Sequence, residues 1–266
     1  MITGIDHVVI GVHDLDAGVA AYERLLNRTA AHRYERDGVA TALMPTANVA
    51  VELIAPKGDT SMALRLRSAM QDRGEGLMSV AFSVANIERA QRRLDRVGLA
   101  PDHVSAGEVS DLHWKRFRAG VEASHGVRMF FIEREAPLRV EDEAGVSGLD
   151  HIVIQAHDME QAAALYGARL GLDMRLDRRL GDRRLMFFRC GDHVVEVVRD
   201  RAAGQRLWGL SWRVRDAAAE QARLVGLGLN VSEVRDGLKP GTRVFTIRDN
   251  TCGVPTLMIE PSRNRD

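Results

Sequence analysis

Two pairs of a histidine and a glutamate recur in this chain at the same spacing. His7 and Glu52 are 45 residues apart, as are His151 and Glu196. Each histidine stands in a β-branched stretch typical of a strand, and each glutamate interrupts an apolar strand, VELIAP or VVEVV. A carboxylate in such a strand is costly to bury without a partner. An imidazole and a carboxylate from two strands of one sheet would supply half of a divalent metal site.

Either pair alone also fits a structural role. A single histidine can be a core residue whose hydrogen bonds are satisfied, and a single glutamate can lie at a strand edge and face water. The recurrence of both residue types at one spacing adds weight to metal binding. The two interpretations both remain open at this point.

The pairs belong to a longer internal repeat. IDHVVIGVHDLDAGVAAYERLL at residues 5–26 matches LDHIVIQAHDMEQAAALYGARL at residues 149–170, so the offset is 144 residues. Asp14 stands at the N-cap position before an amphipathic run in the first copy. Repetition at a fixed offset indicates a duplicated architecture.

Each copy is predicted to form a strand, a helix and three short strands, and this order recurs twice more. The four βαβββ modules begin near residues 1, 77, 148 and 207. One such module cannot cover both faces of its sheet, so modules should pair around a shared cup that could hold a ligand. We predict an α+β fold with two domains of cup-shaped mixed sheets: residues 1–135, an acidic linker at 136–147, and residues 148–266.

The composition excludes several classes of protein. The net charge is zero, with 37 basic and 37 acidic residues, which gives no support for binding nucleic acid or a membrane. Only two cysteines are present, and they form no CxxC pair. No apolar stretch approaches 18 residues, and a strand begins within four residues of the start. We therefore expect a cytoplasmic protein whose partner is a small-molecule substrate.

The repeated pattern resembles the vicinal oxygen chelate superfamily, which includes glyoxalase I, methylmalonyl-CoA epimerase, extradiol dioxygenases and antibiotic-resistance proteins. The resemblance covers nearly the whole chain as two tandem domains. The first half, with IDHVVIGVHDLDAGVAAYERLL, VELIAP and RGEGLMSVAFSV, is similar to the epimerase branch in order and spacing. In that superfamily the first and last strands of each module carry ligands to a metal that holds two neighbouring substrate oxygens.

The resemblance places His7, Glu52, His151 and Glu196 on the ligand positions of modules one and three. In modules two and four, the corresponding positions are Ser79 and Phe130, and Gly209 and Leu257, which we expect to line the pockets. If modules pair as one with two and three with four, each cup holds one histidine and one glutamate. A complete set would need modules one and three to face each other, within the chain or across a homodimer.

The resemblance implies a metal-assisted isomerase, epimerase or lyase that acts on a small oxygen-bearing substrate through an enolate-like intermediate. The cofactor would be a divalent ion, Zn, Ni, Co, Mn or Fe, and Glu52 or Glu196 would double as a proton shuttle. One alternative is a metal-free small-molecule binding or resistance protein, with no cofactor. A weaker alternative is a dioxygenase with an incomplete metal set.

Overall fold

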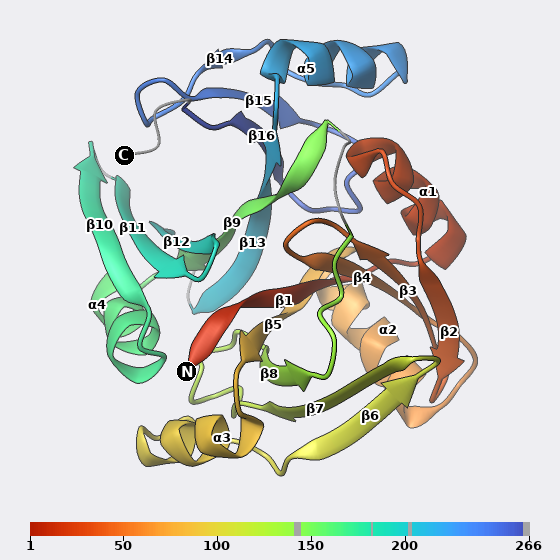
Figure 1. Cartoon of the computed structure of the whole chain (residues 1–266), viewed down its shortest axis with the longest axis vertical. Helices are drawn as coiled ribbons and strands as arrows, with labels where there is room; N and C mark the ends of the chain where they lie inside the picture. Colours follow the sequence, from red (N-terminus) through yellow and green to blue (C-terminus); the bar gives the residue numbers. More distant parts are fainter. Residues whose placement is uncertain (141–144, 182, 202–203, 263–266) are drawn as a thin grey trace. The chain divides into compact units, whose positions relative to one another are not determined.

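The computed structural model describes residues 1–140, 145–181, 183–201 and 204–262 (Figure 1). Residues 141–144 of the predicted linker lie outside the described residues. The chain divides into two compact units, and neither follows a single stretch of sequence. The first contains Met1–Val8, Met78–Leu138 and His151–Trp208, and the second contains Val9–Leu77, Arg139–Asp150 and Gly209–Asp266.

Modules one and two contribute to the first eight-stranded sheet, in the order β2-β3-β4-β1-β5-β8-β7-β6. Its strands are β1 (Ile2–Gly11), β2 (His32–Arg36), β3 (Val39–Pro45), β4 (Ala50–Pro56), β5 (Gly76–Val84), β6 (Ser105–Val109), β7 (Leu112–Arg118) and β8 (Met129–Arg134). Its helices are α1 (Leu15–Leu26), α2 (Ser61–Arg73) and α3 (Ile87–Arg96). Helix α2 was not expected from the sequence.

Modules three and four contribute to the second sheet, which repeats this order as β10-β11-β12-β9-β13-β16-β15-β14. Its strands are β9 (Val146–Ala156), β10 (Asp173–Leu180), β11 (Arg183–Cys190), β12 (His193–Arg199), β13 (Gln205–Val214), β14 (Arg235–Asp236), β15 (Arg243–Ile247) and β16 (Thr256–Glu260). Its helices are α4 (Met159–Ala163), the π-helix η1 (Ala164–Arg169) and α5 (Ala217–Gly226).

The predicted α+β fold with two cup-type domains of βαβββ modules is confirmed. Both sheets are mixed, because β5 pairs with β8, β12 with β9 and β13 with β16 in parallel, whereas β3 with β4 and β11 with β12 are antiparallel. The sheets join module one with two and module three with four. Each sheet therefore contains one histidine and one glutamate of the repeated pairs.

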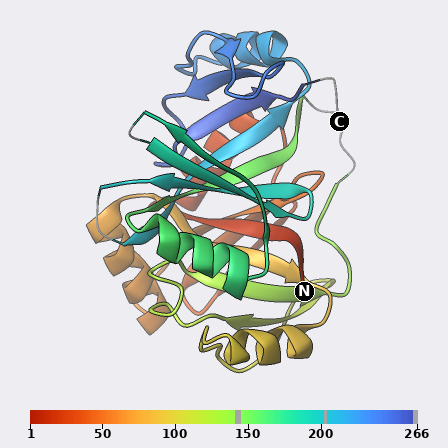
Figure 2. The same cartoon turned by 90° about the vertical axis from the view of Figure 1, so that its left-hand side faces the viewer.

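Helix α1 shows how local sequence produces these elements. The Asp14 side chain accepts a hydrogen bond from the Ala17 N–H at 2.9 Å and caps the first turn. Val19, Tyr22 and Leu25 are buried on one face of the helix. The equivalent helix of module three lies across one face of β10–β12, where the Tyr166 and Phe188 rings are 5.8 Å apart (Figure 2).

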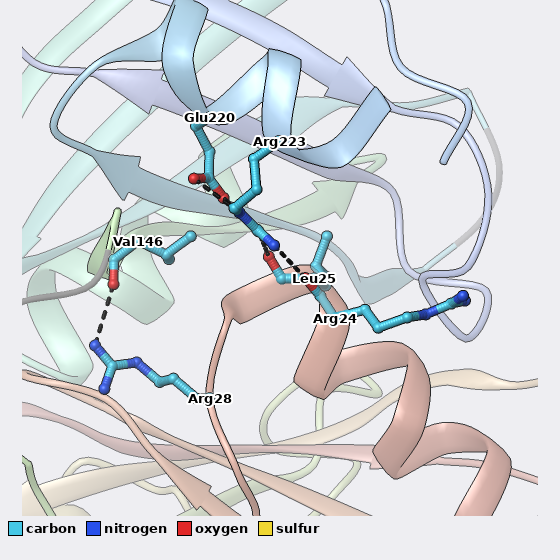
Figure 3. Close-up of polar contacts among 6 residues, drawn as sticks. All are labelled: Arg24, Leu25, Arg28, Val146, Glu220 and Arg223. Atoms are coloured by element: carbon cyan, nitrogen blue, oxygen red, sulfur yellow. Dashed lines mark hydrogen bonds and ion pairs between the residues drawn. The ribbon is translucent and has the colours of Figure 1, made fainter. Parts of the chain in front are cut away.

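An arginine on α5 binds the end of α1 within the second compact unit (Figure 3). Arg223 donates to the Arg24 and Leu25 carbonyls at 2.8 and 2.9 Å, and its guanidinium also pairs with the buried carboxylate of Glu220. Nearby, Arg28 donates to the Val146 carbonyl at 3.2 Å. Carbonyls in the last turn of a helix lack intrahelical partners, so Arg223 satisfies groups that α1 leaves open.

The first compact unit contains the equivalent contact. Arg93 occupies on α3 the place that Arg223 has on α5, and it donates to the Arg169 carbonyl at 2.6 Å. Arg169 follows Leu25 by the repeat offset of 144 residues. Modules one and four, and modules two and three, are thus joined by matching arginine contacts.

Candidate functional site

The second histidine–glutamate pair forms a direct contact. His151 Nε2 lies 3.1 Å from Glu196 Oε2, and the two side chains are 12% and 14% exposed. His151 lies on β9 and Glu196 on β12, which are parallel neighbours. Val194 pairs with His151 and Glu196 with Val153, so alternation directs all four side chains to one face of the sheet. The structure therefore brings this predicted pair together.

The same face continues across β11 to the edge strand β10. Phe187 is opposite Glu196, and Leu176 is opposite Phe187, so these side chains share the face of the pair. Leu176 is 46% exposed and Phe187 is half-buried. The opposite face carries the buried residues Met186, Phe188, Val195 and Val197, against which the helix packs. We call Leu176, Arg178, Leu185, Phe187, His151 and Glu196 the module-three face.

In the first copy the histidine is held differently. His7 Nδ1 lies 2.7 Å from Asp6 Oδ1, and Arg134 Nε donates to both Asp6 oxygens at 2.9 Å. Burial alone raises the pKa of the Asp6 carboxyl, but His7 and Arg134 together hold that pKa below its ordinary value of 3.8. The buried ion pair fixes the carboxylate, which in turn orients the imidazole of His7.

Trp114 supports this arrangement from β7. The Arg134 guanidinium lies over the Trp114 ring, 5.3 Å from its centroid. On β6, Gly107 is opposite Trp114, and a Cβ at that position would come within 2.6 Å of the indole. The glycine is needed because the indole lies directly against the backbone of β6.

Glu52 lies in the other compact unit from His7, and a phenol contacts it. The Tyr34 hydroxyl donates to Glu52 Oε1 at 3.3 Å. Leu43 is opposite Glu52, and His32 is opposite Leu43. His32, Tyr34, Leu43 and Glu52 therefore share one sheet face, which is the equivalent of the module-three face.

The two copies have diverged around a common carboxylate. At the repeat offset, Leu176 replaces His32, Arg178 replaces Tyr34, Leu185 replaces Thr41 and Phe187 replaces Leu43. The face around Glu196 has thus become more apolar, with one added cation. The Glu52 and Glu196 carboxylates therefore have different surroundings.

The residues expected to line the pockets, Ser79 and Phe130 in the first sheet and Gly209 and Leu257 in the second, lie at matching positions of the two sheets. Ala81 pairs with Phe130, and Ser211 pairs with Leu257. Ser79 and Gly209 each lie two residues earlier on these strands. Phe130 points away from its buried neighbour Phe131, which stacks on Phe82 and Phe117, and the Arg116 guanidinium lies 5.5 Å from the Phe130 ring centroid. Their role in a pocket stays a prediction.

The pair of His151 and Glu196 has too few donors to hold a resident divalent metal. Among the residues that the structure describes, no group of three or more His, Cys, Asp and Glu side chains is placed to hold an ion. Protein zinc and iron sites ordinarily use three or four such ligands. His151 and Glu196 supply two, and their equivalents in module four are Gly209 and Leu257.

Several residues at these sites were not expected from the sequence. Asp6 contacts His7 and Tyr34 contacts Glu52. Arg134 holds Asp6 and lies over Trp114. The repetition of Asp6 as Asp150 was visible, but the contact of Asp6 with Arg134 depends on chain segments 128 residues apart. In the second copy Asp150 instead accepts from Arg213 Nε at 2.9 Å.

Family models match both halves of the chain. Residues 5–146, more than half of the chain, match the Glyoxalase-like domain. Residues 148–255 match the Glyoxalase/Bleomycin resistance protein/Dioxygenase superfamily. The chain belongs to the vicinal oxygen chelate superfamily, as a tandem member. The family resemblance drawn from the sequence is confirmed.

Two solved structures share the fold of the whole chain at low identity, and a third aligns with about half of the chain. A mutant of 4-hydroxymandelate synthase from Streptomyces coelicolor is 12% identical with a TM-score of 0.75, covering 100% of this chain and 95% of that chain. The 2,3-dioxygenase LapB from Pseudomonas sp. KL28 is 15% identical with a TM-score of 0.73, covering 100% and 96%. Methylmalonyl-CoA epimerase from S. coelicolor is 21% identical with a TM-score of 0.45, covering 51% and 100%.

None of the curated proteins compared with the chain matches it. In the described ranges, no helix is long and apolar enough to cross a membrane.

Proposed function

We propose that the protein is an isomerase, epimerase or lyase that removes a proton from a carbon next to a carbonyl group of a small substrate. The contact between His151 and Glu196 supports this proposal. His151 Nε2 lies 3.1 Å from Glu196 Oε2, so a neutral imidazole with its proton on Nε2 would donate to that oxygen and fix the carboxylate. Among the described residues no hydrogen bond to Glu196 is found at its other oxygen, Oε1, and the side chain belongs to the module-three face. That oxygen would accept the proton.

The proposed step moves one proton and one electron pair. The carbon–hydrogen bond breaks, Glu196 takes the proton, and the electron pair moves onto the carbonyl oxygen to give an enolate. Return of the proton to the same carbon gives exchange or epimerisation, and loss of a β-substituent gives elimination. His151 holds the carboxylate in place throughout. Positioned bases of this kind contribute about 10²–10⁴-fold to a rate.

The proposed reaction uses no resident metal, since two donors do not make a complete site. This departs from the metal-assisted reaction that the family resemblance implied. Metal analysis of untagged protein should give well under one equivalent of Zn, Ni, Co, Mn or Fe per chain. About one equivalent, lost in both His7→Ala and His151→Ala, would restore the four-ligand prediction, including a homodimeric site.

Proton exchange tests the proposal directly. The probes are pyruvate, phenylpyruvate and methylmalonyl-CoA in D₂O, with deuterium incorporation at the carbon next to the carbonyl followed by NMR. We expect enzyme-dependent incorporation in at least one probe and its loss in Glu196→Gln, which keeps the shape and removes the base. Incorporation that survives in Glu196→Gln would reject Glu196 as the base.

A metal-free binding protein is the second candidate. The apolar side chains of Phe130 and Leu257 at positions where the family carries ligands favour it. In that case no probe would exchange its proton, while ligands would still bind. A ring-cleaving dioxygenase is less consistent with these positions, because it needs a two-histidine, one-carboxylate set in the second domain.

A further inference from the structure

The edge strand β10 differs from its counterpart in a way that bears on the ligand. Its equivalent in module one, β2, presents His32 and Tyr34 on the face of Glu52, whereas β10 presents Leu176 and Arg178 on the face of Glu196. Arg178 is opposite Leu185, and Leu176 is opposite Phe187. An apolar surface with a cation at one end is thereby placed beside the His151–Glu196 pair.

The spacing on this face suits a small molecule. Neighbouring strands lie about 4.8 Å apart, and residues two positions apart on a strand lie about 7 Å apart. Leu176, Phe187 and Glu196 form one row across three strands, and Arg178 lies one step along from that row. One planar ring system could contact Leu176 and Phe187 while an anionic group reaches Arg178.

Arg178 is suited to that role by its surroundings. The neighbouring arginines on the other face are engaged with acids: Arg184 pairs with Asp177 at 2.7 Å and also with Glu160 of α4. Arg179 is opposite Arg184, so it shares this helix-covered face, near Asp177. For Arg178, no acidic partner is found within the described parts of the chain, and its side chain is exposed.

We infer that the module-three face binds an aromatic or otherwise planar apolar anion, with the apolar body on Leu176 and Phe187 and the anionic group at Arg178. The inference rests on the proposed function only for the location of the site. It names the class of ligand. It does not depend on a proton being transferred.

Two dyes with the same aromatic body test it. 8-Anilinonaphthalene-1-sulfonate carries an anionic group, and N-phenyl-1-naphthylamine lacks it. Arg178→Gln should raise the Kd of the sulfonate about fivefold and leave the neutral dye within twofold, as for loss of one partly exposed ion pair. Leu176→Asn, a change at an exposed position, should weaken the binding of both dyes.

Arg179→Gln is the matched control, because it removes one charge from the adjacent position on the opposite face. It should leave both Kd values within twofold. Equal weakening by Arg178→Gln and Arg179→Gln, equal binding of the two dyes to the unmodified protein, or no binding of the sulfonate would each overturn the inference.

Glu196→Gln separates this inference from the proposed reaction. It should abolish deuterium incorporation and leave sulfonate binding within about threefold, since the substitution keeps the size of the side chain. Normal dye behaviour with undiminished incorporation would reject the reaction and keep the ligand class. Loss of deuterium incorporation in Glu196→Gln, together with a protein that does not distinguish the sulfonate from the neutral dye, would keep the reaction and reject the ligand class.

Discussion

The two repeated histidines each contact a carboxylate. His7 is held through Nδ1 by Asp6, and His151 is held through Nε2 by Glu196. A hydrogen bond to one ring nitrogen helps to set the tautomer and the orientation of an imidazole. Different carboxylates therefore help to orient the two imidazoles, even though both copies keep the same residue types at the same spacing.

Glu196→Ala should lower proton exchange or ligand binding at least as much as Glu52→Ala. The Glu196 carboxylate lies among more apolar neighbours and contacts an imidazole, while Glu52 is bound by the Tyr34 hydroxyl. Deuterium incorporation and dye binding, measured in parallel on both variants, give the comparison. Unimpaired proton exchange and dye binding in both variants would show that neither carboxylate belongs to the functional site.

Arg134→Met should lower the free energy of unfolding by about 3 kcal/mol at neutral pH, because it leaves the buried Asp6 carboxylate without its cation. The pKa of Asp6 is lowered in the folded protein, so its contribution to stability is present above pH 3.8 and is lost as the pH falls further. The difference between the two proteins should therefore narrow in acid.

Urea unfolding at several pH values measures this difference. Arg128→Met, at an exposed position just before the same strand, is the control and should change stability by less than about 0.5 kcal/mol. A loss in Arg134→Met no larger than in the control would show that the Asp6 ion pair does not stabilise the fold.

At the scale of elements, the sequence predicted best those features that depend on residues close together in the chain. The Asp14 cap and the buried face of α1 follow from nearby residues, and both were predicted. Helix α2 was missed because only Ala63, Leu66 and Met70 are buried, so its apolar stripe is narrow among many charges. The π-helix η1 has no local signature either, since its equivalent in the first copy is α-helical.

Arg223→Met should cost about 3 kcal/mol of stability. It removes two hydrogen bonds to the end of α1 and leaves the buried Glu220 carboxylate unpaired. Arg93→Met should cost about 1–2 kcal/mol, because its contact with the Arg169 carbonyl involves no buried acid. Urea unfolding of both variants measures the difference.

A double variant of α5 tests why Arg223→Met lowers the stability. Glu220→Gln combined with Arg223→Met should be more stable than Arg223→Met alone, since the unpaired buried charge has been removed. If the double variant is the less stable of the two, the charge on Glu220 is not what makes the loss of Arg223 costly.

At the scale of the whole molecule, the offset of 144 residues predicted four modules but could not say which modules share a sheet. Either pairing satisfies the same repeat, and the choice depends on contacts between distant segments. The structure pairs one with two and three with four, which separates the two histidine–glutamate pairs into different sheets. Whether His7, Glu52, His151 and Glu196 could form one site depends on how the modules pair, and the sequence does not contain that information.

Reciprocal contacts between the copies accompany this arrangement. Asn48, in the turn before β4, bonds both the N–H and the carbonyl of Leu149 at 2.8 Å. His193, at the start of β12, accepts from the Ile5 N–H at 3.3 Å. Ile5 and Leu149 are related by the repeat offset. Each copy thus binds the first strand of the other through the same turn.

Asn48→Ala and His193→Ala should each lower the free energy of unfolding by about 2 kcal/mol, because each leaves buried backbone groups without a partner. The two contacts share no residue and lie in different compact units. The double variant should therefore lose the sum of the two single losses to within about 0.5 kcal/mol. Urea unfolding of the four proteins gives the cycle, and a double loss well short of the sum would show that the first contact to break already releases the other.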